Sequence, residues 1–211
     1  MAGLFDRIRN FFADVEPEPT DSEKAEALHR NIAERQISEV MALENAYAGQ
    51  DDLWEGEVLD AIDFSVLASE EEREHFDNGI APWINIVSRE AEVEGLIDPD
   101  SLALNYPNAK IVFDYPLANP TTRDISTSGE GFSRRELVEL IGRFYEEIYE
   151  EEEASATTKT LSMSERKIMN RNQTDGIYGI WGHDLDDIAL SGVEVRRTAN
   201  GEIILILGIE S

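Results

Sequence analysis

The sequence predicts an α+β protein with a mainly helical N-terminal half, followed by a small antiparallel sheet on which one long amphipathic helix packs. Apolar residues recur with helical spacing through much of residues 1–98. A β-prone run then follows at Lys110–Tyr115. Near the C-terminus, Asn200-Gly201 separates two further β-prone segments, which is typical of a β-hairpin. We expect three regions: a helix with a proline linker at 1–19, an acidic helical region at 20–98 and an α+β domain at 99–211.

The composition restricts the classes of function. The 211 residues include 45 acidic and 18 basic side chains, which give a formal net charge of −27. A field of this sign repels nucleic acids and anionic membranes, so we expect no nucleic-acid partner. The chain has no cysteine, which excludes disulfides and cysteine-ligated metal centres. No apolar run is long enough to span a bilayer, so we expect a soluble protein without a transmembrane segment.

Residues 1–19 form an amphipathic unit in this interpretation. Their apolar side chains follow a helical period up to Glu16-Pro17-Glu18-Pro19, where the prolines end the helix and stiffen the chain. We expect this stripe either to pack on its own domain or a sister subunit, or to dock on a partner or a membrane interface. The predicted interaction residues are Leu4, Phe5, Ile8, Phe11, Phe12 and Val15.

In the C-terminal region, Thr121–Thr127 is expected to pair with Lys110–Tyr115 as a second strand. Ser133 and Glu136 have the spacing of a capping box, which predicts the start of a helix over about 133–152. The acidic end of this helix, Glu150 to Glu153, should fray and be solvated because its charge opposes the helix dipole.

The predicted hairpin has a two-residue turn that would place Val195 opposite Ile206 and Arg197 opposite Ile204. The last strand is apolar on both faces, so we expect it to lie inside the sheet.

The most distinctive stretch is Tyr178–Asp187, which contains Gly-Ile-Trp-Gly-His-Asp. His183 and Asp184 are weak catalytic candidates as an acid–base pair. Asp184, Asp186 and Asp187 are weak candidates for binding a hard cation. The alternatives are that the aromatic residues complete a core, that His183 caps a turn, and that the aspartates begin a short helix. No motif for a cofactor is present, so we expect none.

The sequence resembles uncharacterised proteins of large DNA viruses of eukaryotes over about Ile111 to Ile209. The segments that carry the resemblance are Asn119–Ile125, Gly131–Val138, Tyr145–Glu150 and Tyr178–Leu185. The resemblance implies no catalytic residue. It implies a viral protein of the infected cell, located in its cytoplasm or in the virion.

These observations favour a non-enzymatic interaction or structural protein that binds a partner, or itself, through the N-terminal helix. One alternative is a metal-dependent hydrolase that uses the Tyr178–Asp187 region. The other is an acidic mimic of nucleic acid that binds a basic protein, which the net charge of −27 suggests.

Overall fold

The computed structural model describes residue 38, residues 54–70 and residues 73–211. The strands of this part are β1 (Glu57–Asp63), β2 (Val66–Leu67), β3 (Ile80–Ala81), β4 (Ile84–Asn85), β5 (Leu102–Leu104), β6 (Asn108–Phe113), β7 (Thr121–Ser126), β8 (Phe132–Ser133), β9 (Ala189–Arg197) and β10 (Ile203–Glu210). Its α-helices are α3 (Arg89–Glu92) and α4 (Arg134–Ser155), and its 3-10 turns are η1 (Arg73–His75), η2 (Asp77–Gly79), η3 (Val93–Gly95), η4 (Met163–Glu165) and η5 (Leu185–Asp187).

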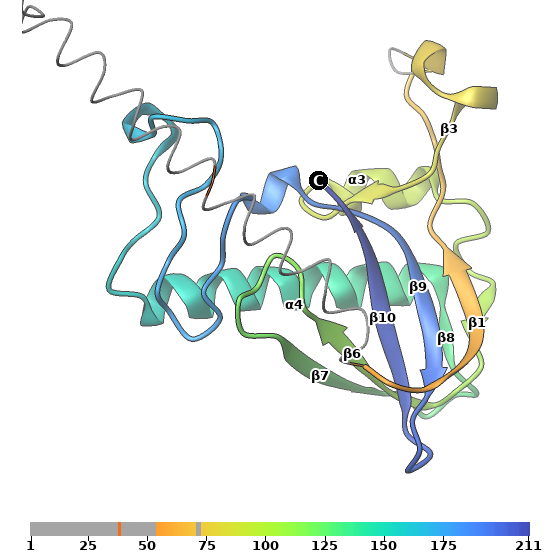
Figure 1. Cartoon of the computed structure of the whole chain (residues 1–211). Helices are drawn as coiled ribbons and strands as arrows, with labels where there is room; N and C mark the ends of the chain where they lie inside the picture. Colours follow the sequence, from red (N-terminus) through yellow and green to blue (C-terminus); the bar gives the residue numbers. More distant parts are fainter. Residues whose placement is uncertain (1–37, 39–53, 71–72) are drawn as a thin grey trace, which may run out of the picture. The chain divides into compact units, whose positions relative to one another are not determined.

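The main sheet has the strand order β1-β9-β10-β6-β7, with β4 also paired to β9 (Figure 1). Its neighbours are antiparallel except for β10 and β6, which run parallel. The central position of β10 confirms that the last strand lies inside the sheet, and β7 pairs with β6 as predicted.

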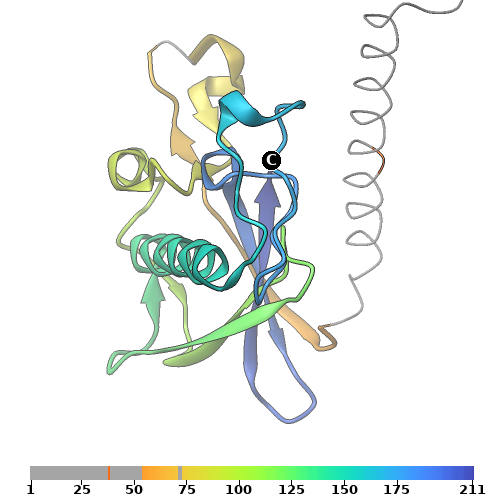
Figure 2. The same ribbon diagram turned by 90° about the vertical axis from the view of Figure 1, so that its left-hand side faces the viewer.

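Helix α4 crosses one face of the sheet (Figure 2). Its inward side chains, which include Ile141 and Ile148, belong to the same buried cluster as Ile111, Val195 and Leu205 of the strands. The ring of Tyr145 meets that of Phe113 edge to face, and the Tyr145 hydroxyl donates a hydrogen bond to the carbonyl oxygen of Tyr115 at 2.9 Å. Apolar burial therefore fixes α4 on the sheet.

The predicted fold class is wrong. The described residues contain more strand than helix, and residues 57–98, predicted to be helical, supply β1 and β4 to the main sheet. The sheet is mixed, not purely antiparallel. In the segment Pro82–Val87, Ile84 and Ile86 are fully buried while Trp83 and Val87 are exposed. This alternation suits a strand, and pairing with β9 outweighs the helical character predicted for the 20–98 region.

The hairpin has a different register from the predicted one. Arg197 lies opposite Ile203 and Val195 opposite Leu205. The Thr198 amide donates to the Glu202 carbonyl at 2.9 Å, which leaves three residues in the loop, with Gly201 at a φ of 88°. The observed loop includes one residue more than the predicted two-residue turn, and its glycine adopts the left-handed conformation. Each cross-strand pair of the hairpin is therefore shifted by one residue from the predicted register.

The predicted interaction residues Leu4, Phe5, Ile8, Phe11, Phe12 and Val15 lie outside the described residues, as does the whole 1–19 region. Among the residues that the structure describes, no helix combines the length and the apolar character needed to cross a bilayer.

Arg89 docks the short helix α3 onto α4. Its side chain is buried, donates to the Ile86 carbonyl at 2.7 Å and forms a two-pronged pair with Glu146 at 2.8 and 2.9 Å. The guanidinium lies across Gly142 of α4, where an added Cβ would fall 2.2 Å from the Arg89 side chain. A glycine is therefore needed at this crossing.

We predict that Gly142→Val lowers the free energy of unfolding by about 1–3 kcal/mol, because the new side chain must displace Arg89. Urea unfolding followed by circular dichroism measures the change. Gly129→Ala is the control, since a Cβ there meets only ordinary contacts, the nearest being 3.6 Å away. Equal stability of the two variants would contradict this role of Gly142.

Candidate functional site

The Tyr178–Asp187 stretch lies against the core at the C-terminal end of α4. Tyr178, Ile180 and Trp181 are buried, and the Trp181 ring meets the Tyr115 ring edge to face at 5.5 Å. Gly179 and Gly182 have φ angles of 65° and 76°, which allow the tight path between these side chains. His183 lies beside the same aromatic pair. The burial of Tyr178, Ile180 and Trp181 agrees with the interpretation that this stretch completes a core.

Glu152 of α4 holds this stretch in place. Its side chain is fully buried, and its carboxylate accepts a hydrogen bond from the Thr174 hydroxyl at 2.6 Å. Three backbone amides also donate to it, those of Gly176 at 2.9 Å, Tyr178 at 2.8 Å and Gly179 at 3.1 Å. A Cβ at Gly176 would lie 2.5 Å from the Glu152 carboxyl group, so only glycine fits there.

These contacts shift the titration of Glu152. Burial acts to raise the pKa of the carboxyl group, but the hydrogen bonds from Thr174 and from the three amides outweigh it and hold the pKa below its usual value. The predicted fraying of this helix end is wrong for Glu152, because a loop distant in sequence supplies its donors. Glu150 is exposed, as expected.

Arg171 is the second buried charge beside this stretch. Its guanidinium donates to the Ile180 carbonyl at 3.1 Å and to the Thr160 hydroxyl at 2.6 Å, and it lies over the Tyr149 ring. Burial lowers the pKa of Arg171 from its ordinary value. Burial also raises the pKa of the Tyr149 hydroxyl, which donates to the His183 carbonyl at 3.1 Å.

The Asp184 carboxylate is paired with arginine. Arg166 donates to both of its oxygens, one of them at 2.9 Å, and the Nε atom of Arg171 lies 3.7 Å away. Arg166 therefore occupies both oxygens of this carboxylate and Arg171 lies close by, which makes the carboxylate a poor cation ligand.

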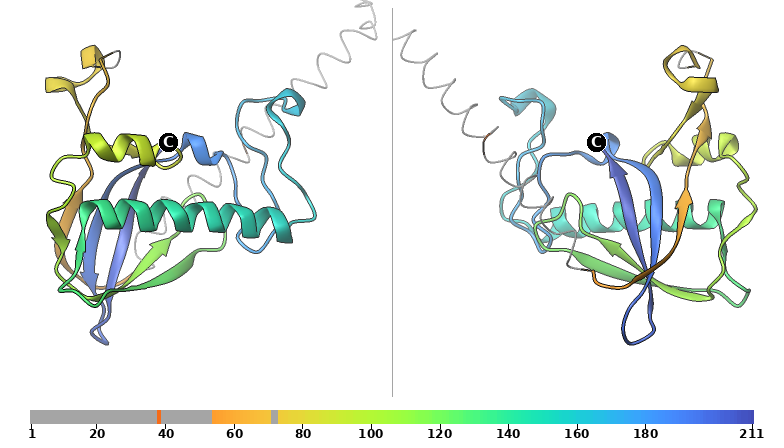
Figure 3. Two further views of the ribbon diagram at one scale, coloured as in Figure 1. Left: turned by 180° about the vertical axis from the view of Figure 1, so that it is seen from behind. Right: turned by 45° about the vertical axis from the view of Figure 1, so that its right-hand side comes forward.

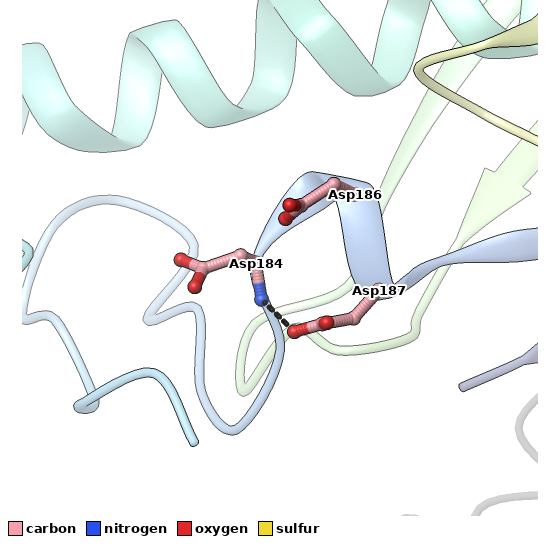
Figure 4. Close-up of side chains that lie close together, drawn as sticks. All are labelled: Asp184, Asp186 and Asp187. Atoms are coloured by element: carbon pink, nitrogen blue, oxygen red, sulfur yellow. Dashed lines mark hydrogen bonds between the residues drawn. The ribbon is translucent and has the colours of Figure 1, made fainter. Parts of the chain in front are cut away.

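Asp184, Asp186 and Asp187 come together as predicted, with one carboxylate oxygen of each within 4.8 Å of the others (Figure 4). Asp187 accepts the Asp184 amide at 3.0 Å, in a capping box at the start of η5. Asp186 and Asp187 are exposed to solvent. These contacts favour the helix-start interpretation over a metal site, and the catalytic and metal candidates stay predictions.

A groove that was not predicted from the sequence lies on another part of the surface. We call it the Trp83 groove. It has a volume of about 620 Å³ and lies between β2, the segment around β3 and β4, and α3. Its apolar lining includes Val66, Leu67, Phe76, Trp83, Val87 and Ala91, and its charged lining residues are Glu92 and Asp186.

The groove exposes large apolar side chains. Leu67, Trp83 and Val87 have exposed fractions of 61%, 36% and 49%, and the exposed Ile80 lies directly beside Leu67 as its partner in the β2–β3 pair. The Trp83 ring stands edge to face against Phe76, with centroids 5.4 Å apart. The alternation of residues in Pro82–Val87 is the sequence pattern that could have predicted this surface. In a strand it places Trp83 and Val87 on the side opposite the buried isoleucines.

Asn85 and Glu92 set the shape of the groove floor. The Asn85 side chain accepts the amides of Val87 and Ser88 at 2.9 and 3.0 Å, and donates to the Asp186 carbonyl at 2.9 Å. Glu92 accepts the Asn85 amide at 2.9 Å and the Ser88 hydroxyl. The groove lining thus combines a fixed polar network with apolar side chains.

Comparisons of the chain with protein-family models, curated proteins and solved structures found no match. The resemblance to proteins of large DNA viruses stays a prediction.

We predict that Glu152→Gln lowers the free energy of unfolding by about 2–3 kcal/mol at neutral pH, because an amide accepts fewer of the four donors. The folded-state pKa of Glu152 is depressed, so the wild-type advantage is present above the unfolded-state pKa and is lost as the pH falls through the folded-state value. Urea unfolding of both proteins from neutral to acidic pH measures this. Glu150→Gln, on the exposed face of α4, should be neutral; a pH-independent difference for Glu152→Gln would contradict the proposed role of its charge.

Proposed function

We propose that this chain is a non-enzymatic interaction protein whose Trp83 groove binds a polypeptide that presents a large apolar side chain beside a basic one. The observation that carries the proposal is the gathering of exposed Leu67, Trp83 and Val87 around a concave surface. Exposed apolar side chains that are contiguous and surround a hollow are typical of a binding surface. Single exposed apolar side chains, in contrast, are scattered over the surface of most proteins.

The energetics support a peptide-like partner. Covering the exposed parts of Leu67, Trp83 and Val87 removes apolar surface from water. Tryptophan at the centre of an interface is commonly a residue that carries much of the binding free energy. Phe76 and the Asn85 network hold Trp83 and Val87 in place. These side chains therefore lose little conformational entropy on binding.

The charges support a basic flank on the partner. Glu92 and Asp186 are the charged lining residues of the groove, and the chain as a whole carries a net charge of −27. These acidic lining residues and the negative field attract a cationic segment and repel an anionic one. The binding constant should therefore fall moderately with salt, while the apolar contact remains.

The other candidate stretch gives less support to catalysis. The Asp184 carboxylate is engaged by Arg166, and Tyr178 and Trp181 are part of the core. The contacts of Asp184, Tyr178 and Trp181 within the fold explain why these residues are present in the Tyr178–Asp187 stretch without a catalytic role. We therefore favour the interaction protein over the hydrolase.

To test the proposal, a display library of short peptides is selected against the full chain, and binding of the winners is measured by tryptophan fluorescence and calorimetry. We expect peptides with an aromatic or long aliphatic residue next to Lys or Arg. Trp83→Ala should weaken them at least about tenfold, and Asp186→Asn should weaken them less and reduce the salt dependence.

Leu102→Ala is the matched control, since Leu102 is an exposed apolar residue that does not line the groove. It should leave the binding constant unchanged. Thermal unfolding of each variant checks that the fold is kept. Selected peptides that bind Trp83→Ala as well as the wild-type chain, or a selection that yields none, would contradict the proposal.

A further inference from the structure

The segment 157–173, which we call the basic loop, differs in charge from the rest of the chain. It contains four basic residues, Lys159, Arg166, Lys167 and Arg171, and one acidic residue, Glu165. Figure 3 shows this segment beyond the C-terminal end of α4. Arg171 is buried and Arg166 is paired with Asp184, so Lys159 and Lys167 are the exposed basic residues that the loop presents within a chain of net charge −27.

The basic loop also exposes apolar side chains. Met169 is 81% exposed, Met163 61% and Leu161 40%, and the nearby Ile177 is exposed as well. Of the ten large apolar side chains that are exposed in the described part of the chain, four are these and four are Leu67, Ile80, Trp83 and Val87 at the groove. The exposed apolar surface is thus concentrated in two patches.

The base of the basic loop is firmly held. Arg171 is buried beneath it, Arg166 is paired with Asp184, and the Asn172 side chain accepts the Leu161 amide at 2.8 Å and donates to the Lys159 carbonyl at 3.1 Å. The loop therefore presents its methionines from a fixed support, which lowers the entropy lost on binding.

We propose that the basic loop of one copy docks into the Trp83 groove of a second copy, an assignment that rests on the proposed function of the groove. The unbranched, polarisable side chains of Met163 and Met169 suit an aromatic-lined hollow. Lys167, exposed between them in sequence, would approach the Glu92 and Asp186 side of the groove. The loop thus matches the partner chemistry that the groove requires, an apolar side chain beside a basic one.

The two patches lie at opposite ends of α4 (Figures 1 and 3). Each contact joins unlike patches, so a pair with a single contact retains one free loop and one free groove, whereas a pair that docks reciprocally closes as a two-fold dimer. Copies can then add head to tail until a ring closes or a filament grows. This predicts association that rises with protein concentration, to a reciprocal dimer or to larger head-to-tail species.

Sedimentation velocity of the full chain tests the proposal through a pair of complementary variants. The loop variant carries Met163→Glu and Met169→Glu, and the groove variant carries Trp83→Ala and Leu67→Lys. We expect the wild-type chain to form dimers or larger species with rising concentration. Each variant alone should associate at least about tenfold more weakly.

An equimolar mixture of the two variants should restore one contact, between the intact loop of the groove variant and the intact groove of the loop variant. Because neither free end can continue, the mixture should stop at a 1:1 pair. This rescue also shows that both variants are folded. Leu102→Glu, an exposed site outside both patches, should behave as the wild-type chain does.

A wild-type chain that stays monomeric would overturn the proposal, as would variants that associate like the wild-type chain, or a mixture that forms no pair. If the selected peptides still bind the groove in such a case, only the assignment of the loop fails. If they do not, the proposed function fails with it.

Discussion

The buried carboxylate of Glu152 is the interaction on which the C-terminal part of this structure depends. Removing a carboxylate from water costs several kcal/mol unless it is paired or hydrogen-bonded. Here the Thr174 hydroxyl and the amides of Gly176, Tyr178 and Gly179 all donate to it. One side chain of α4 thereby fixes a turn that brings Tyr178 and Trp181 into the core and sets the base of the 157–173 loop.

The residues that stabilise the fold are different from the exposed residues to which a binding function is assigned. Residues that looked chemically active, such as Asp184 and the Trp-Gly-His tract, make contacts within the fold. The exposed apolar surface lies instead at the Trp83 groove and on the basic loop, at the two ends of α4 (Figure 1). In a chain with a net charge of −27, the exposed Lys159 and Lys167 of the loop can attract the Glu92 and Asp186 side of the groove of another copy.

Local sequence signals predicted several features well. The capping box of Ser133 and Glu136 forms, β7 pairs with β6, and the apolar last strand is central in the sheet. These features depend on neighbouring residues or on simple burial. The hairpin was predicted but not its register, because the turn length depends on whether Ala199 pairs or joins the loop.

The failures have a common physical cause, which is pairing between distant segments. The 20–98 region was predicted to be helical, but Ile84 and Ile86 are buried in an extended segment that pairs with β9, a strand far along the chain. The solvated interpretation of the acidic helix end failed at Glu152, whose donors lie more than twenty residues further along the chain. The Trp83 groove was missed for the same reason, since β2, Trp83 and α3 meet only in the folded chain.

Amide hydrogen exchange followed by NMR tests the central claim most directly. If the Glu152 carboxylate binds the amides of Gly176, Tyr178 and Gly179, these three should be strongly protected at neutral pH. Their protection should fall together as the pH drops through the lowered pKa of Glu152. Exchange of these amides at the rate of an unstructured loop would contradict the account.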